Sequence, residues 1–238
     1  MRACQLSLTV ISILWALIAG PAHARILGTG GAAVVIAPPA ISAPNVLQSN
    51  TQIYVWEEKQ DYVTTTSIPY NIDGTPGTYN AVSSVMTTGG TLFAGTFVDS
   101  HMIHFDQLGP GTTTLTGFVE FEDPITAVMV LCDELDSGDG DIGWSSTAYA
   151  DCASTGSFRP VDWVTTGDNE AIVISGDRLR ISFTLRTSNV FDQIRVVTQP
   201  GAVASVPVSG ALATALLLLL LIGVGVTAGG LLYRRVVD

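Results

Sequence analysis

The pattern of apolar and polar residues divides the chain into two apolar ends and a middle of short alternating segments. The clearest alternation covers residues 178–186, where Leu, Ile or Phe occupies every second position and Arg, Ser or Thr the positions between. A period of two places each set on its own face of a β-strand. Residues 171–174 are apolar, and Gly176-Asp177 separates the two segments. This order predicts a β-hairpin.

Other segments also have the composition of strands. Residues 115–121 alternate, and residues 125–131 are apolar apart from Thr126, as in a strand buried on both faces. Shorter aromatic or β-branched runs cover 52–56, 62–66 and 194–197. Residues 26–43 are rich in Gly, Ala and Pro, and we interpret them as a leader or a loosely attached first strand. Between the two apolar ends, no segment before residue 200 has helical periodicity over about three turns. We therefore expect an all-β domain, an antiparallel sandwich or jelly roll.

The first apolar segment has the form of a secretory signal peptide. Arg2 supplies a positive charge, residues 6–19 are apolar, and Ala22-His23-Ala24 matches the small-x-small cleavage pattern. A spanning helix is the alternative, but the apolar run is shorter than the roughly 20 residues that a span needs. We expect signal peptidase to remove residues 1–24, so that an exported domain begins at residue 25.

The second apolar segment is long enough to cross a membrane. Residues 211–233 carry no charge, and a bilayer core of about 30 Å needs about 20 such residues. Arg234 and Arg235 follow, and positive charge marks the cytoplasmic flank. The expected order is a β-rich extracytoplasmic domain (25–200), a linker (201–210), a transmembrane helix (211–233) and a cytoplasmic basic tail (234–238). A buried core helix is the alternative for residues 211–233.

A short motif precedes this segment. Val206, Pro207, Ser209 and Gly210 lie directly before the apolar run, with Val208 among them. Together with the span and the Arg pair, they resemble C-terminal sorting signals of the exosortase or PEP-CTERM type, whose Val-Pro-Asp-Ser-Gly variant differs only at Val208. They also resemble the Leu-Pro-x-Thr-Gly signal of sortases. The resemblance implies cleavage by a processing enzyme, and a plain anchor without processing is the alternative. Residues 100–106 and 192–198 resemble segments of exported proteins with such signals, which implies no activity.

Composition narrows the classes of partner. The formal net charge is −11 and the isoelectric point is near 4.4, which argues against nucleic-acid binding. Charged residues make up 13% of the chain. The part between the two apolar ends has about 175 residues, which suits one domain. An exported protein at the cell envelope, anchored by one C-terminal span before any processing, fits this composition.

The cysteines bear on the compartment. Cys132 and Cys152 remain after removal of the signal peptide, and an oxidising compartment favours a disulfide between them. Two free thiols or a metal pair are the alternatives.

Acidic residues cluster between these cysteines. Carboxylates on a loop that contains glycine can bind Ca²⁺, although the spacing does not match an EF-hand. The candidate ligands are Asp133, Asp136, Asp139 and Asp141. A solvated acidic loop is the alternative. His101 and His104 are three positions apart, so on a strand they would point to opposite faces and would not share a metal.

Aromatic residues raise a further possibility. Trp56, Trp144 and Trp163 are candidates for stacking on sugars, and core packing is the alternative. Trp144 stands out because it lies among polar residues within the expected disulfide loop. Since no catalytic motif is apparent, we expect a non-catalytic surface or matrix protein without a resident cofactor. A carbohydrate-binding module, with surface polysaccharide as partner, and a Ca²⁺-stabilised module are the alternatives.

Overall fold

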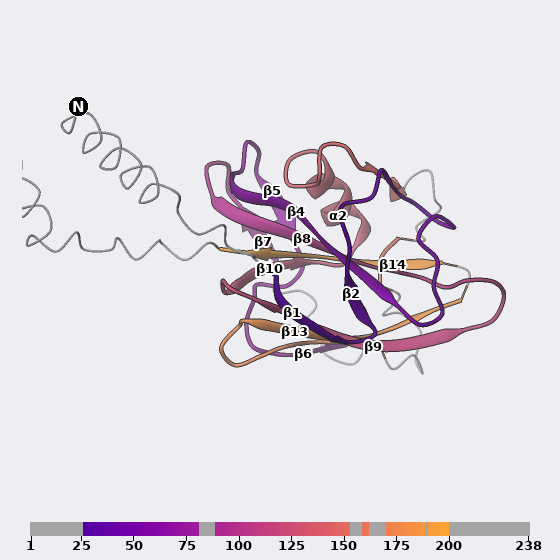
Figure 1. Cartoon of the computed structure of the whole chain (residues 1–238). Coiled ribbons are helices and arrows are strands. Elements are labelled where there is room, and N and C mark those ends of the chain that lie inside the picture. Colours follow the sequence, from indigo (N-terminus) through magenta and orange to yellow (C-terminus); the bar gives the residue numbers. More distant parts are fainter. Residues whose placement is uncertain (1–25, 81–88, 153–158, 162–169, 189, 200–238) are drawn as a thin grey trace, which may run out of the picture. The chain divides into compact units, whose positions relative to one another are not determined.

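The computed structural model describes residues 26–80, 89–152, 159–161, 170–188 and 190–199. The expected signal peptide, linker, sorting motif, transmembrane helix and basic tail lie outside these residues, as does Trp163. Strands dominate the described part and form two five-stranded sheets (Figure 1). None of the helices in these ranges has the length and apolar character of a membrane span.

The first sheet, sheet A, is antiparallel throughout. Its order is β1 (Ile26–Gly31), β9 (Thr113–Phe121), β13 (Arg180–Thr187), β12 (Ala171–Ile174) and β6 (Gly77–Asn80). The predicted hairpin is confirmed as β12 and β13, paired from Ala171 with Thr184 to Ile174 with Ile181. Arg178 has a φ of 62° in the connecting turn, so β13 begins two residues later than the alternation indicated.

The second sheet, sheet B, is mixed. Its order is β10 (Ile125–Met129), β14 (Phe191–Thr198), β8 (Phe97–Asp106), β4 (Ile53–Val63) and β2 (Ala33–Val35). β2 pairs with β4 in parallel, so the expectation of a purely antiparallel fold is corrected here. Two smaller sheets pair β3 (Ile41–Ser42) with β11 (Ala148–Tyr149) in parallel, and β5 (Ile68–Tyr70) with β7 (Gly90–Leu92).

The main hydrophobic core draws side chains from both five-stranded sheets. Ile103 and Ile194 come from sheet B, while Val119, Ile181 and Phe183 come from sheet A. The alternating sequence of β13 explains its contribution to this core, because its odd-numbered apolar side chains are buried there. Two sheets that share one core fit the expected β-sandwich.

A second apolar cluster lies on the other face of sheet B. It contains Ala127, Met129 and Val197 of the sheet together with Leu135 of α2 (Cys132–Asp139). Figure 1 shows α2 on the side of β4, β8 and β14 that faces away from β9 and β13. β10 is therefore buried on both faces, as its largely apolar run predicted.

The interpretation of residues 26–43 as a leader or loose strand is wrong. β1 pairs with β9 along its length, and β2 pairs with β4, so this segment belongs to both large sheets. Gly31, with a φ of 67°, lies against the backbone of β9, and a β-carbon there would be 2.5 Å from the Thr116 carbonyl oxygen. Ala33 is buried in the main core. The segment's glycine content thus reflects close packing.

Two further expectations need correction. The separate strands at 52–56 and 62–66 are one strand, β4, which continues through five polar residues with two irregularities in its pairing to β8. The acidic segment expected as a loop begins as the helix α2. With only eight residues, this helix is too short to give a periodic signal. Asp133 and Glu134 lie in its first turn, where negative charge is favourable.

Candidate functional site

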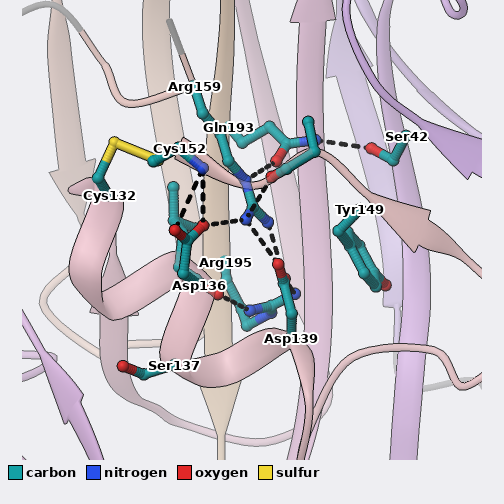
Figure 2. Close-up of polar contacts among 12 residues, drawn as sticks. Ser42, Cys132, Asp136, Ser137, Asp139, Tyr149, Cys152, Arg159, Gln193 and Arg195 are labelled. Atoms are coloured by element: carbon teal, nitrogen blue, oxygen red, sulfur yellow. Dashed lines mark hydrogen bonds and ion pairs between the residues drawn. A yellow bond between two sulfur atoms is a disulfide. The ribbon is translucent and has the colours of Figure 1, made fainter. Parts of the chain in front are cut away.

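Of the candidate residues that the structure describes, most lie on or after α2, on the outer side of sheet B. Figure 2 shows this region, in which α2, β11 and residue 159 surround side chains that rise from β14. The Cys132–Cys152 disulfide closes it, with Cα atoms 5.7 Å apart. The predicted disulfide is confirmed. It joins the first residue of α2 to the chain beyond β11.

A fully buried ion pair lies at the base of the region. Arg195 of β14 donates from Nε to Glu58 Oε2 over 2.7 Å and from Nη2 to Glu58 Oε1 over 3.0 Å. Ser100, on the strand between them, donates its hydroxyl to Glu58 Oε2 over 2.8 Å. Bidentate geometry of this kind gives the strongest carboxylate contacts that Arg forms.

A second buried guanidinium, that of Arg159, holds α2. Its Nη1 donates to Asp136 over 2.8 Å and to Asp139 over 2.6 Å, and its Nη2 donates to Asp139 over 2.8 Å. Asp139 also accepts a hydrogen bond of 2.8 Å from Arg195 Nη2. One carboxylate of α2 therefore joins both guanidiniums, and the helix is fixed to the sheet by charge as well as by Leu135.

The electrostatics of the cluster favour the charged form of Arg195. Burial disfavours a charged guanidinium, but Glu58 and Asp139 outweigh burial and raise the pKa of Arg195. Tyr149 donates its hydroxyl to Glu58, and its ring lies 5.3 Å from Arg195 and 5.6 Å from Arg159. Burial and the neighbouring Glu58 charge raise the pKa of Tyr149, so its hydroxyl remains a donor.

Gln193 extends the cluster towards β3. Its amide nitrogen donates to Ser42 over 2.6 Å and to His104 Nδ1 over 3.0 Å, while its amide oxygen accepts a hydrogen bond from Arg159. Burial and the Arg159 charge lower the pKa of His104 to about 3, so the ring is neutral and Nδ1 accepts the bond. The amide is thus fixed by three neighbours from three segments of the chain.

The four candidate Ca²⁺ ligands do not converge on one point. Asp136 and Asp139 bind Arg159, whereas Asp133 is exposed on α2. Within residues 26–199 as described, no group of three or more His, Cys, Asp or Glu side chains has the geometry to hold a metal ion. Because guanidiniums already occupy two of the candidate carboxylates, this arrangement gives the calcium hypothesis no support.

Asp141 serves a different contact. Its Oδ2 accepts hydrogen bonds from the Thr66 hydroxyl and from the backbone N–H groups of Thr65 and Thr66, both at 2.8 Å, and its Oδ1 accepts from the hydroxyls of Thr65 and Tyr62, both at 2.7 Å. Burial alone would raise the pKa of Asp141, but these donors lower it to about 2. The carboxylate therefore connects the end of β4 to the turn after α2.

The two histidines and the two described tryptophans have different surroundings. The ring of His101 lies tilted against Phe121 of sheet A, at 4.7 Å between ring centroids, and His104 bonds to Gln193 on the other face of β8. The expectation that they point to opposite faces is confirmed. Trp56 is fully buried, whereas Trp144 is 41% exposed. Of these two tryptophans, only Trp144 is open to a ligand.

Sequence reasoning missed the residues that organise this site: Glu58, Tyr149, Arg159, Gln193 and Arg195. A signal for two of them was available. Glu58 has the same parity as Tyr54 and Trp56, and Arg195 lies within an apolar strand, so each charge fell at a position expected to be buried. Two opposite charges at buried strand positions predict an internal ion pair. Arg159 lies in no strand or helix and gave no such signal.

Comparison with known proteins adds no relative. No family model, curated protein or solved structure matches the chain.

Proposed function

We propose that this chain is a non-catalytic surface protein, exported by its N-terminal segment and sorted or anchored by its C-terminal segment. The observation that carries the proposal is the Cys132–Cys152 disulfide. Structural disulfides persist in oxidising compartments and are rare in the cytosol. In this proposal the β domain is a sandwich of jelly-roll type, presented outside the cytoplasmic membrane.

The buried charge cluster supports a structural role for its members. Glu58, Arg159 and Arg195 have no solvent-accessible surface and bind one another or α2, so a substrate in solution does not reach them. Their work is to hold the disulfide-bonded segment against sheet B. A domain stabilised in this way suits prolonged display outside the cell.

The C-terminal segment completes the proposal. Val206, Pro207, Ser209 and Gly210 are the proposed motif for an exosortase- or sortase-like enzyme, and residues 211–233 are the proposed temporary span. Arg234 and Arg235 hold the tail on the cytoplasmic side. Signal peptidase and the processing enzyme are then the partners during export.

Intact-mass measurement of the protein from native membranes tests the proposal. We expect a mass that lacks residues 1–24 and ends near residues 206–210. A mass that includes residues 211–238 indicates a plain anchor, and a mass that includes residues 1–24 with both cysteines reactive to maleimide contradicts export. Pro207→Ala is expected to block C-terminal processing, and Val203→Ala, outside the motif, is the matched control.

The exposure of Trp144 favours a second candidate function, carbohydrate binding. An exposed indole face packs well against the apolar face of a sugar ring. Glycan-array binding that disappears in Trp144→Ala supports this function. Phe93→Ala is the matched control, because Phe93 is 72% exposed on a different loop. A glycan array without signal rules out carbohydrate binding.

A further inference from the structure

A pocket at one end of sheet B holds a buried carboxylate without a cationic partner. The pocket has a volume of about 450 Å³, within the range of small-molecule sites. It lies among the segments that follow β3, β8 and β13. Its lining residues are Pro44, Asn45, Gln48, Asp106, Gln107, Leu108, Gly109, Pro110, Ser188 and Val190.

Asp106 is the charged group of this pocket. The residue is 6% exposed, and its carboxylate accepts a hydrogen bond from the Asn45 backbone N–H over 2.6 Å. The Gln48 side chain is the other polar group beside this carboxylate. Both neighbours are neutral, and no ion pair to Asp106 occurs within the described residues. Burial outweighs their effect and raises the pKa of Asp106. A buried carboxylate without a counter-charge destabilises the folded domain.

The amide nitrogens of the two neighbouring glutamines already donate within the protein. Gln48 Nε2 already donates to Asn45 Oδ1 over 3.2 Å and to the Gln107 carbonyl over 2.8 Å. Gln107 is 4% exposed, and its amide nitrogen donates to the Gly109 carbonyl over 2.9 Å, whereas its Oε1 accepts no hydrogen bond. A ligand that satisfies this pocket must therefore bring hydrogen-bond donors and positive charge.

A primary ammonium group has these properties, with three donors and no acceptor. The chain itself has one lysine, Lys59, and its Nζ lies over the Tyr62 ring at 5.1 Å from the centroid. Since no described ammonium group pairs with Asp106, the ammonium group in this proposal comes from another molecule. The apolar surfaces of Pro44, Pro110 and Val190 suit the carbon frame of that molecule, and the Ser188 hydroxyl offers a partner for hydroxyl groups on the frame.

We propose that this pocket binds an amino sugar with a free primary ammonium group, which pairs with Asp106. The unpartnered Gln107 Oε1 provides a second acceptor for the ligand. Hydroxyl groups on the frame favour an amino sugar over a lysine side chain, whose stem has none to offer Ser188. This site is separate from Trp144 and does not depend on export or C-terminal processing, so its failure leaves those proposals standing.

Calorimetric titration of the full chain with glucosamine, N-acetylglucosamine and lysine amide tests the site. We expect saturable binding of glucosamine and none of N-acetylglucosamine, which lacks the charge. Asp106→Asn is expected to weaken binding about tenfold or more, because it removes the charge and keeps the shape. Asp133→Asn makes the same charge change on exposed α2 and is expected to leave binding unchanged.

A second variant provides a test that does not depend on whether Asp106→Asn folds. Leu108 lines the pocket and is 57% exposed, so Leu108→Arg places a competing cation at the rim without disturbing the core. We expect it to weaken glucosamine binding about tenfold at an unchanged melting temperature. Equal binding by wild type and both pocket variants, no binding of glucosamine, or tighter binding of lysine amide than of glucosamine overturns the proposal.

Discussion

Arg195 and Glu58 form a bidentate ion pair, at 2.7 and 3.0 Å, across the intervening strand β8, and neither side chain has any solvent exposure. Desolvating two charges is costly, and the pair offsets that cost only while both members are present. Asp139 links the pair to Arg159, so a change in one member affects the attachment of α2 as well as the sheet.

Glu58→Gln removes the charge but retains the shape of the side chain. We expect it to lower the free energy of unfolding by about 3–5 kcal/mol, because Arg195 remains buried with Asp139 as its single carboxylate partner. Urea unfolding measures the change. The control is Glu120→Gln, which breaks an exposed contact of 3.6 Å with Arg180 and is expected to cost less than about 1 kcal/mol. Equal costs for the two variants would contradict a structural role for the buried pair.

The disulfide stabilises the same region by a different means. It closes a loop with a sequence separation of 20 residues, and we expect Cys132→Ser with Cys152→Ser to lower the free energy of unfolding by about 3 kcal/mol. Because Arg159 still binds Asp136 and Asp139, the double variant should unfold in one cooperative transition. Circular dichroism during denaturation checks both points. Separate transitions for the helix and the sheet would show that the ion pairs alone do not hold α2.

Asp141 makes stability dependent on acid pH. Its pKa in the folded protein is about 2, below the ordinary value of 3.8. The stabilisation it gives is therefore complete above about pH 4 and is lost as the pH falls towards 2. Asp141→Asn is expected to cost about 2 kcal/mol at pH 7 and much less at pH 2. Unfolding curves across this range measure the difference. A pH-independent cost would mean that the charge of Asp141 contributes nothing.

Chelation distinguishes the ion-pair account of α2 from a calcium site. Since Asp136 and Asp139 bind a guanidinium, we expect the melting temperature of the protein to be the same with and without excess EDTA. Differential scanning calorimetry is the measurement. A fall that added Ca²⁺ reverses would restore the calcium hypothesis.

The two described tryptophans should respond differently to truncation. Trp56 is fully buried, and Trp56→Ala is expected to cost about 3–5 kcal/mol of unfolding free energy. Trp144 is partly exposed, and Trp144→Ala should cost less than about 1 kcal/mol. Thermal unfolding separates the two. A large cost at Trp144 would make it a packing residue and weaken its candidacy for sugar binding.

Local patterns predicted the parts of the fold in which each residue's environment follows from its neighbours in sequence. The β12–β13 hairpin and the doubly buried β10 are examples. The sequence pattern predicted two strands in place of β4, because residues 57–61 are polar. In the fold, Arg195 and Ser100 bind the Glu58 carboxylate, but both residues are far from Glu58 in sequence, so no local pattern shows these contacts. Partners distant in sequence decided that assignment.

The candidate site was predicted in its location but not in its chemistry. The cysteine pair and the acidic run drew attention to residues 132–152, and the disulfide formed as expected. The role of the acids depends on Arg159, which stands 20 residues beyond Asp139 and outside any strand or helix. The cluster of carboxylates raised oxygen ligands for a metal as one possibility and a solvated loop as the other, whereas the fold pairs Asp136 and Asp139 with a guanidinium.

The first described strands have a consequence for the kinetics of folding. Ile26 pairs with Phe121, while Ala33 pairs with Ile53, so residues 26–35 are shared between two sheets and β1 can pair only once β9 is available. β14, the last strand of the described residues, lies between β10 and β8 in its sheet. High sequence separation between partners slows folding. The domain therefore closes only after nearly the whole of it has been synthesised, and in the export that we propose this delay would favour translocation of an unfolded chain.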